Sequence, residues 1–173
     1  MNNLDVKEII LLLIIIVLGI FISLNLFKNN KVTFITDSDY LYDSAVEYLI
    51  KNDNNPYVKK KNYKKFVDYK GFGIAQDKKY KYAYMWIVTE SYYEQDGKLI
   101  SEFGSSLPYK FIFDKKTDKI IKAITANDGK LFKVSIKNMY PKSIQNKVLN
   151  YTVDYSNLQK KVDNYYKDKI NVN

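Results

Sequence analysis

The sequence predicts an α+β protein in which an N-terminal transmembrane helix precedes one domain, an antiparallel meander sheet of roughly four to six strands covered by helices. Three observations predict this fold class. An uninterrupted apolar segment occupies residues 9–27. Alternating side chains and Asp-Gly turn signals fill the middle of the chain, as is typical of consecutive antiparallel strands. Apolar residues at helical spacing flank this β-rich part on both sides.

The apolar segment begins at Ile9, ends at Phe27 and holds no charged residue. As a helix it is roughly 28 Å long, close to the ~30 Å hydrocarbon thickness of a bilayer. Because no small-residue cleavage site follows it, we expect an uncleaved anchor. Residues 1–30 then form a short N-tail and transmembrane anchor, and residues 31–173 form a single domain. Gly19 and Ser23 are a small-xxx-small pair that lets such helices approach closely, although this pair does not define the oligomeric state.

The lysines around this segment and the layout of the chain favour opposite orientations. Lys7 precedes the segment while Lys28 and Lys31 follow it, which slightly favours a cytoplasmic domain. Long domains nevertheless cross membranes largely regardless of charge, and a short N-tail followed by one span is the usual layout of an exported domain. We therefore expect a single-pass protein of the cell membrane with an extracytoplasmic domain.

Composition restricts the chemistry of this domain. The 28 basic residues are all Lys, the net charge is +9, and the chain has no His and no Cys. Ordinary zinc sites, thiol chemistry and histidine bases are excluded, so we expect no metal and no cofactor. The absence of Arg and of any nucleic-acid motif argues against a nucleic-acid partner. The lysines fit attraction to anionic lipid headgroups or wall polymers, but the codon bias of an AT-rich genome, with the lysines as a solvated surface, is the favoured explanation.

After a tether at residues 28–36, residues 37–53 predict an amphipathic helix. Asp37, Ser38 and Asp39 offer capping oxygens, and the apolar positions recur at helical spacing: Leu41, Ala45, Tyr48 and Leu49. A calcium loop beginning at Asp37 would need Gly at position 42 and Glu at position 48, where this chain has tyrosines. We therefore interpret the acidic residues as helix caps.

The next segments predict strands. A first strand at residues 66–69 is followed by Gly71 and Gly73, which predict a bend or bulge between strands. Residues 80–86 alternate, so that one face carries an aromatic row and the other carries small or aliphatic side chains. The aromatic row consists of Tyr80, Tyr82, Tyr84 and Trp86. The Asp96-Gly97 turn joins this strand to residues 98–103 and places Gln95 opposite Lys98 and Tyr93 opposite Ile100.

The remaining elements are read from turn residues and helical stripes. Residues 104–108 predict a loop before a strand at 109–113, and strands at 119–125 and 131–136 follow. Pro141 starts a short helix that ends at Leu149. Asp154 or Ser156 caps a final helix with one apolar stripe: Leu158, Val162, Tyr165, Tyr166 and Ile170. We expect the strands to pair as a meander and the helices to cover one face.

Residues 83–148, about 65 of the 173, contain a set of specific motifs: Trp86, Asp96-Gly97, residues 104–109, Asp128-Gly129, and Ile136-Lys137 leading to Tyr140-Pro141. In these motifs the segment resembles the extracytoplasmic C-terminal module of BlaR/MecR-type antibiotic-sensor membrane metallopeptidases of Firmicutes. The resemblance implies a stand-alone exported module without the peptidase part, since a chain without His cannot carry an H-E-x-x-H zinc site. The function of the module itself is undefined, so the resemblance gives no catalytic residue.

These patterns favour a membrane-anchored, non-catalytic binding or sensing module of undefined ligand over an enzyme. Its expected partners are membrane lipid, through the N-terminal span, and a partner membrane protein or a wall polymer. The aromatic row is the candidate contact surface, because rings with a polar tip stack on sugars and peptides at low entropic cost. The alternative is that these rings are core residues beneath a covering helix.

Two other functions stay open. One is a structural or assembly subunit that acts through a partner membrane protein. The other is a carboxylate-based enzyme on a cone-shaped α+β fold, with Glu90 or Glu102 as acid and base. The predicted register places Glu90 opposite Phe103 and Glu102 opposite Ser91, so that the two carboxylates point to opposite faces.

Overall fold

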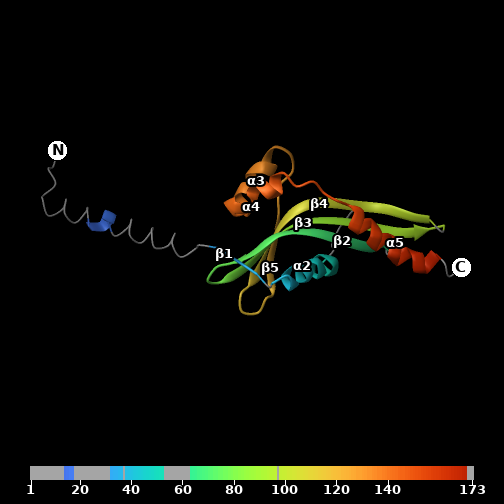
Figure 1. Cartoon of the computed structure of the whole chain (residues 1–173), viewed down its shortest axis with the longest axis horizontal. Helices are drawn as coiled ribbons and strands as arrows, with labels where there is room; N and C mark the ends of the chain where they lie inside the picture. Colours follow the sequence, from blue (N-terminus) through green and yellow to red (C-terminus); the bar gives the residue numbers. More distant parts are fainter. Residues whose placement is uncertain (1–13, 18–31, 37, 53–62, 97, 171–173) are drawn as a thin grey trace, which may run out of the picture.

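The computed structural model describes residues 14–17, 32–36, 38–52, 63–96 and 98–170 (Figure 1). It confirms the α+β class, with a five-stranded antiparallel sheet in the order β1-β2-β3-β4-β5. The strands are β1 Thr33–Ile35, β2 Lys64–Gln76, β3 Tyr80–Gln95, β4 Lys98–Asp114 and β5 Ile120–Thr125. The helices are α2 Tyr40–Lys51, η1 Gly129–Leu131, α3 Phe132–Met139, α4 Lys142–Leu149 and α5 Ser156–Ile170.

The predicted membrane span lies almost entirely outside the described residues. Residues 14–17 are helical and exposed, while Ile9, Gly19, Ser23 and Phe27 are not among the residues described. Within the described residues, no helix combines the length and the apolar character that crossing a bilayer requires. The anchor therefore stays a prediction from the sequence.

The central strand β3 is covered on both faces. Ala83, Met85 and Ile87 pack on the face where α2 lies, and the alternate residues Tyr82 and Tyr84 pack on the face where α3 and α4 lie. Our expectation that helices cover one face of the sheet is therefore wrong. The physical reason is that β3 is apolar or aromatic at odd and even positions alike, so each face must be shielded from water.

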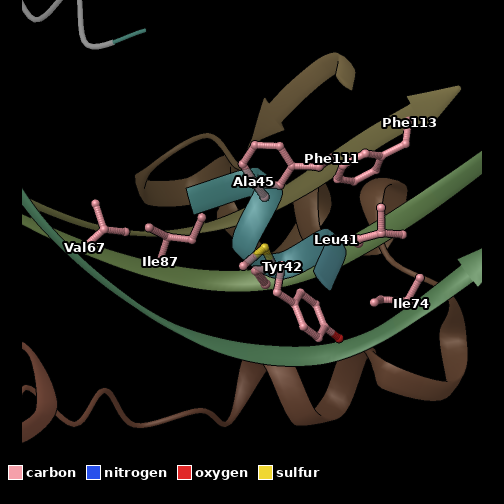
Figure 2. Packing of buried hydrophobic residues seen from close by; sticks show 10 residues of the cluster. Leu41, Tyr42, Ala45, Val67, Ile74, Ile87, Phe111 and Phe113 are labelled. Atoms are coloured by element: carbon pink, nitrogen blue, oxygen red, sulfur yellow. The ribbon is translucent and has the colours of Figure 1, made fainter. Parts of the chain in front are cut away.

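Helix α2 supplies the core of the first face. Leu41, Tyr42 and Ala45 point into the sheet against Phe111 and Phe113 of β4. Figure 2 shows these side chains together, with the strands curving around the helix. Leu41, Ala45 and both phenylalanines are completely buried. Leu41 and Ala45 belong to the predicted apolar stripe, whose Tyr48 and Leu49 are only partly buried, whereas the buried Tyr42 is not among the residues predicted to face inward. The N-cap Asp39 makes no side-chain capping bond, and Asp37 lies outside the described residues.

Three helices cover the opposite face. Ile144 and Val148 of α4 pack over the tyrosines of β3, and Tyr140, between α3 and α4, donates its hydroxyl to the carbonyl oxygens of Met85 (3.0 Å) and Tyr109 (2.8 Å). Helix α5 covers the distal part of this face through three residues of its predicted stripe, Leu158, Val162 and Tyr166. The short helix that begins after Pro141 and the final helix are both confirmed.

The hairpin of β3 and β4 has the predicted register at its tip, with Gln95 opposite Lys98. Farther from the turn the register shifts, because Tyr92 pairs with Ser101 and Ser91 pairs with Phe103. Glu102 is the extra residue of this bulge, and Glu90 lies opposite Gly104 instead of Phe103. The predicted partners, Phe103 for Glu90 and Ser91 for Glu102, are therefore wrong, since a two-residue turn does not reveal a bulge five residues away.

Three predicted element boundaries differ from the structure. Residues 104–108 belong to β4 and are not a loop, because pairing with β3 runs through them. Residues 66–74 belong to one continuous strand, β2, which contains the glycine bulge. Residues 131–136, predicted as a strand, lie in η1 and α3. There the structure buries only Ile136 fully and exposes Val134, the pattern of a helix.

We expect Phe111→Ala to lower the free energy of unfolding by about 3–5 kcal/mol, because it opens a cavity between α2 and the sheet. Phe111 is completely buried. Denaturant titration of the full chain in detergent, followed by the fluorescence of Trp86, measures this loss. The exposed Val134 is the matched control, and Val134→Ala should change stability by less than about 0.5 kcal/mol. Equal losses for both variants would contradict the core described above.

Candidate functional site

The structure places the aromatic row of β3 mainly beneath α3 and α4. Tyr84 is 2% exposed and Tyr82 is 9% exposed, while Tyr80 and Trp86 are half-buried. The ring of Tyr84 lies 5.3 Å from that of Tyr140, and the Tyr82 and Tyr84 rings stack at 6.5 Å. The open surface of the row therefore belongs to Tyr80 and Trp86. A ligand-binding role for the row stays a prediction.

Polar groups surround the middle of this row. The hydroxyl of Tyr82 donates to Oδ2 of Asp77 at 2.5 Å, and Nζ of Lys110 lies 4.7 Å from the centre of the Tyr82 ring. Burial raises the pKa of Tyr82 and of Tyr84, and burial lowers the pKa of Lys110. The ammonium is held by a cation–π contact inside the fold.

A groove of about 690 Å³ lies beside this row, between the glycine bulge of β2 and the C-terminal end of α4. It extends onto the segment that connects α4 to α5. Its lining combines two aromatic rings, two amides and two ammonium groups: Phe72, Tyr151, Asn146, Asn150, Lys70 and Lys147. Of these side chains, sequence reasoning identified none as functional.

The bulge that presents Phe72 to the groove is fixed from the other face of the sheet. Gly71 pairs with Met85 and Gly73 pairs with Tyr84, so Phe72 is the extra residue. The amide of Gly73 donates to the hydroxyl of Tyr42 at 2.9 Å, which satisfies a donor that the bulge would otherwise leave unpaired.

Two glycines make this contact possible. A Cβ on Gly71 would lie 2.6 Å from the Tyr42 ring, so only glycine leaves space for that ring. Gly73 has φ +133°, a conformation that side-chain-bearing residues rarely adopt. The sequence Gly-Phe-Gly therefore turns the strand so that its aromatic residue faces α4.

The aromatic wall of the groove rests on the tryptophan of the predicted row. Phe72 and Tyr151 meet edge to face with ring centres 5.5 Å apart, and Trp86 lies 5.4 Å from Tyr151 on the core side. Nε1 of Trp86 donates to Oγ of Ser106 at 2.8 Å, which fixes the orientation of the indole. Trp86 is thus a positioning residue for the groove.

The polar wall follows from the periodicity of α4. Because Ile144 and Val148 face the core, Asn146 and Lys147 between them face outward. The groove lining contains no carboxylate among the described residues. The nearby Asp68 is paired with Lys161 at 2.8 Å, and Oδ1 of Asp154 accepts the amide of Ser156 at the start of α5. The groove is therefore electropositive.

This arrangement suits the binding of a polar, negatively charged ligand with flat or apolar faces. Ring edges and faces stack on sugar or polyol carbons, amides donate to and accept from hydroxyl groups, and ammonium groups neutralise phosphates or carboxylates. In the part of the chain that the structure describes, no group of three or more acidic side chains is arranged to hold a metal ion.

No protein-family model, no curated protein and no solved structure matches the chain. The resemblance to the module of sensor peptidases therefore stays a prediction.

We expect Tyr42→Phe to lower the free energy of unfolding by about 1–3 kcal/mol, because the amide of Gly73 loses its buried acceptor. Denaturant titration measures the loss. Tyr155→Phe is the matched control, since this side chain is 49% exposed, and should cost less than about 0.5 kcal/mol. A Tyr42→Phe variant as stable as the control would show that the bulge does not depend on this hydroxyl.

We expect stability to fall at alkaline pH because tyrosines ionise earlier in the unfolded chain. Burial and the neighbouring Glu90 raise the pKa of Tyr92 to about 12, and burial and Asp43 raise that of Tyr69 to about 12. An unfolded tyrosine titrates near pH ~10. Because the folded pKa is the higher one, the stabilisation is complete below pH ~10 and is lost as the pH rises toward ~12. Denaturant midpoints and ultraviolet phenolate absorbance measure this, and simultaneous titration of all 17 tyrosines near pH ~10 in the folded chain would contradict it.

Proposed function

We propose that this chain is a membrane-anchored, non-catalytic extracytoplasmic module that binds an anionic wall polymer in the groove between β2 and α4. The observation that carries the proposal is the composition of the groove, which combines an aromatic wall, two side-chain amides and two lysines. A polymer of phosphate-linked or carboxylate-bearing sugars or polyols presents the complementary groups.

The aromatic wall and the lysines contribute in different ways. Phe72 and Tyr151 are half-buried and pack on each other, and Tyr151 also packs on Trp86, so both rings lose little conformational entropy when a ligand stacks on them. Lys70 and Lys147 are exposed, and each contact with an anion in such a setting is worth at most about 1 kcal/mol. Affinity for one repeat is therefore modest, and a polymer gains from repeated anionic groups.

The membrane part of the proposal is supported by the apolar segment of residues 9–27 and by the layout of a short N-tail before one span. An anchored domain meets a wall polymer at high local concentration, so weak contacts per repeat are sufficient for binding.

We expect Lys70→Gln/Lys147→Gln to weaken binding of a glycerol-phosphate oligomer of defined length by about 10- to 30-fold, since about 1 kcal/mol is lost per lysine. Isothermal titration calorimetry on the full chain in detergent measures the affinity at two salt concentrations. Neutral dextran serves as the uncharged probe and should bind much more weakly than the oligomer.

Lys160→Gln/Lys167→Gln on α5 is the matched control, because both lysines are exposed and the change in net charge is the same. It should leave the affinity within about twofold of the unmodified chain. If both double variants weaken binding equally, the attraction is a property of the net charge and the groove is not the site.

A further inference from the structure

Two lysine-rich turns lie at the end of the sheet where β1 begins. Thr33 pairs with Gln76, next to the β2–β3 turn, and Tyr80 pairs with Asp114, next to the β4–β5 turn. Figure 1 shows both turns on the β1 side of the domain. The turns are joined directly, since the backbone amide of Lys115 donates to the carbonyl oxygen of Lys79 at 3.1 Å. We name residues 77–79 and 115–119 the lysine end of the sheet.

At the lysine end four lysines are exposed, whereas the carboxylates accept hydrogen bonds from groups of the fold. The exposed residues include four lysines, Lys78, Lys79, Lys116 and Lys119. Each carboxylate is engaged within the fold. Asp77 accepts Tyr82 and the amides of residues 79 and 80, and Asp114 accepts the amides and the hydroxyl of the turn that follows it.

The third carboxylate, Asp118, is paired with Lys81 at 2.7 Å and accepts the hydroxyl of Tyr40 at 2.5 Å. Within residues 77–79 and 115–119 the exposed charges are therefore those of the four lysines. Glu47 of α2, which borders Asp118 and Lys119, is paired with Lys51 at 3.0 Å. The lysine end therefore fits an anionic partner with a broad surface.

An exposed aromatic ring accompanies these lysines. Tyr40, at the start of α2, is 49% exposed. Phe34 of β1 is 41% exposed, but its ring lies toward Gly73 and Tyr84 and not toward the two turns. The hydroxyl of Tyr40 also accepts Nζ of Lys81 at 3.2 Å, so its ring is fixed beside the β4–β5 turn. Lysines interspersed with exposed aromatic rings are typical of surfaces that meet the headgroup region of a bilayer.

The chain length leaves the lysine end little freedom to move away from a membrane. Between the predicted end of the span at Phe27 and the start of β1 at Thr33 there are residues 28–32, which span at most ~18 Å when fully extended. The end of the sheet where β1 begins is therefore the part of the domain that lies nearest to the headgroups. Ammonium groups within a Debye length of ~8 Å attract anionic lipid.

We propose that the lysine end of the sheet docks on the anionic headgroups of the same membrane that holds the anchor, with phosphatidylglycerol as the class of lipid. This inference rests on the membrane anchor of the proposed function and is independent of ligand binding in the groove. Docking determines the orientation of the domain relative to the membrane surface.

The test uses the full chain in nanodiscs of phosphatidylcholine alone or with 40% phosphatidylglycerol, about the charge density of an anionic membrane surface. Amine acetylation followed by mass spectrometry gives the modification rate of each lysine. We expect the rates at Lys78, Lys116 and Lys119 to fall at least about threefold with phosphatidylglycerol, and high salt to reverse the effect. The distal lysines Lys98, Lys160 and Lys167 should keep their rates.

Two triple variants sharpen the result. Lys78→Gln/Lys116→Gln/Lys119→Gln should remove the protection of the remaining Lys79, whereas the matched control Lys98→Gln/Lys160→Gln/Lys167→Gln should retain it. Equal rates in the two lipids, or equal protection of proximal and distal lysines, would overturn docking while leaving the anchor intact. A chain that fails to enter nanodiscs of either lipid would instead overturn the anchor, and docking with it.

Discussion

The burial of β3 on both faces is the constraint on which the rest of this structure depends. A strand with aliphatic side chains at odd positions and aromatic ones at even positions exposes apolar surface on either side unless each side is covered. The chain meets this requirement with α2 on one face and with α3, α4 and α5 on the other. The three-layer order of helix, sheet and helices follows from the composition of this one strand.

Tyr42 connects the two faces. Its ring fills the space beside Gly71 and its hydroxyl accepts the amide of Gly73, so a residue of α2 fixes a bulge whose extra residue, Phe72, faces α4. Packing on the first face thereby determines the shape of the groove on the second. On that second face, Trp86 supports Tyr151 from the core side in the same way. The shape of the groove thus depends on Tyr42 and Trp86, two residues that do not line it.

The sequence predicts α2, α4, α5 and the hairpin tip because these depend on local spacing, but it predicts a strand where η1 and α3 lie. Helix α2, the final helix and the pairing of Gln95 with Lys98 follow from periodicity and from one Asp-Gly turn. The bulge at Glu102 and the continuity of β4 through Pro108 depend on the neighbouring strand, which local patterns do not contain. The groove is more difficult to predict from the sequence, since Phe72 and Tyr151 are far apart in the chain. Only the Gly-Phe-Gly bulge signal marked one of its walls.

The two cationic surfaces are compatible because the sheet separates them. The groove lining on β2 ends at Phe72 and the lysine end begins at Asp77, so four residues of β2 lie between them, and the Cα atoms of Phe72 and Asp77 are about 17 Å apart at ~3.3 Å per residue. This is about two Debye lengths at physiological salt, so anionic lipid at one surface barely screens the other. In the proposed docking, the lysine end contacts the membrane and the groove lies above the headgroups, where the proposed polymer would approach it from the aqueous side.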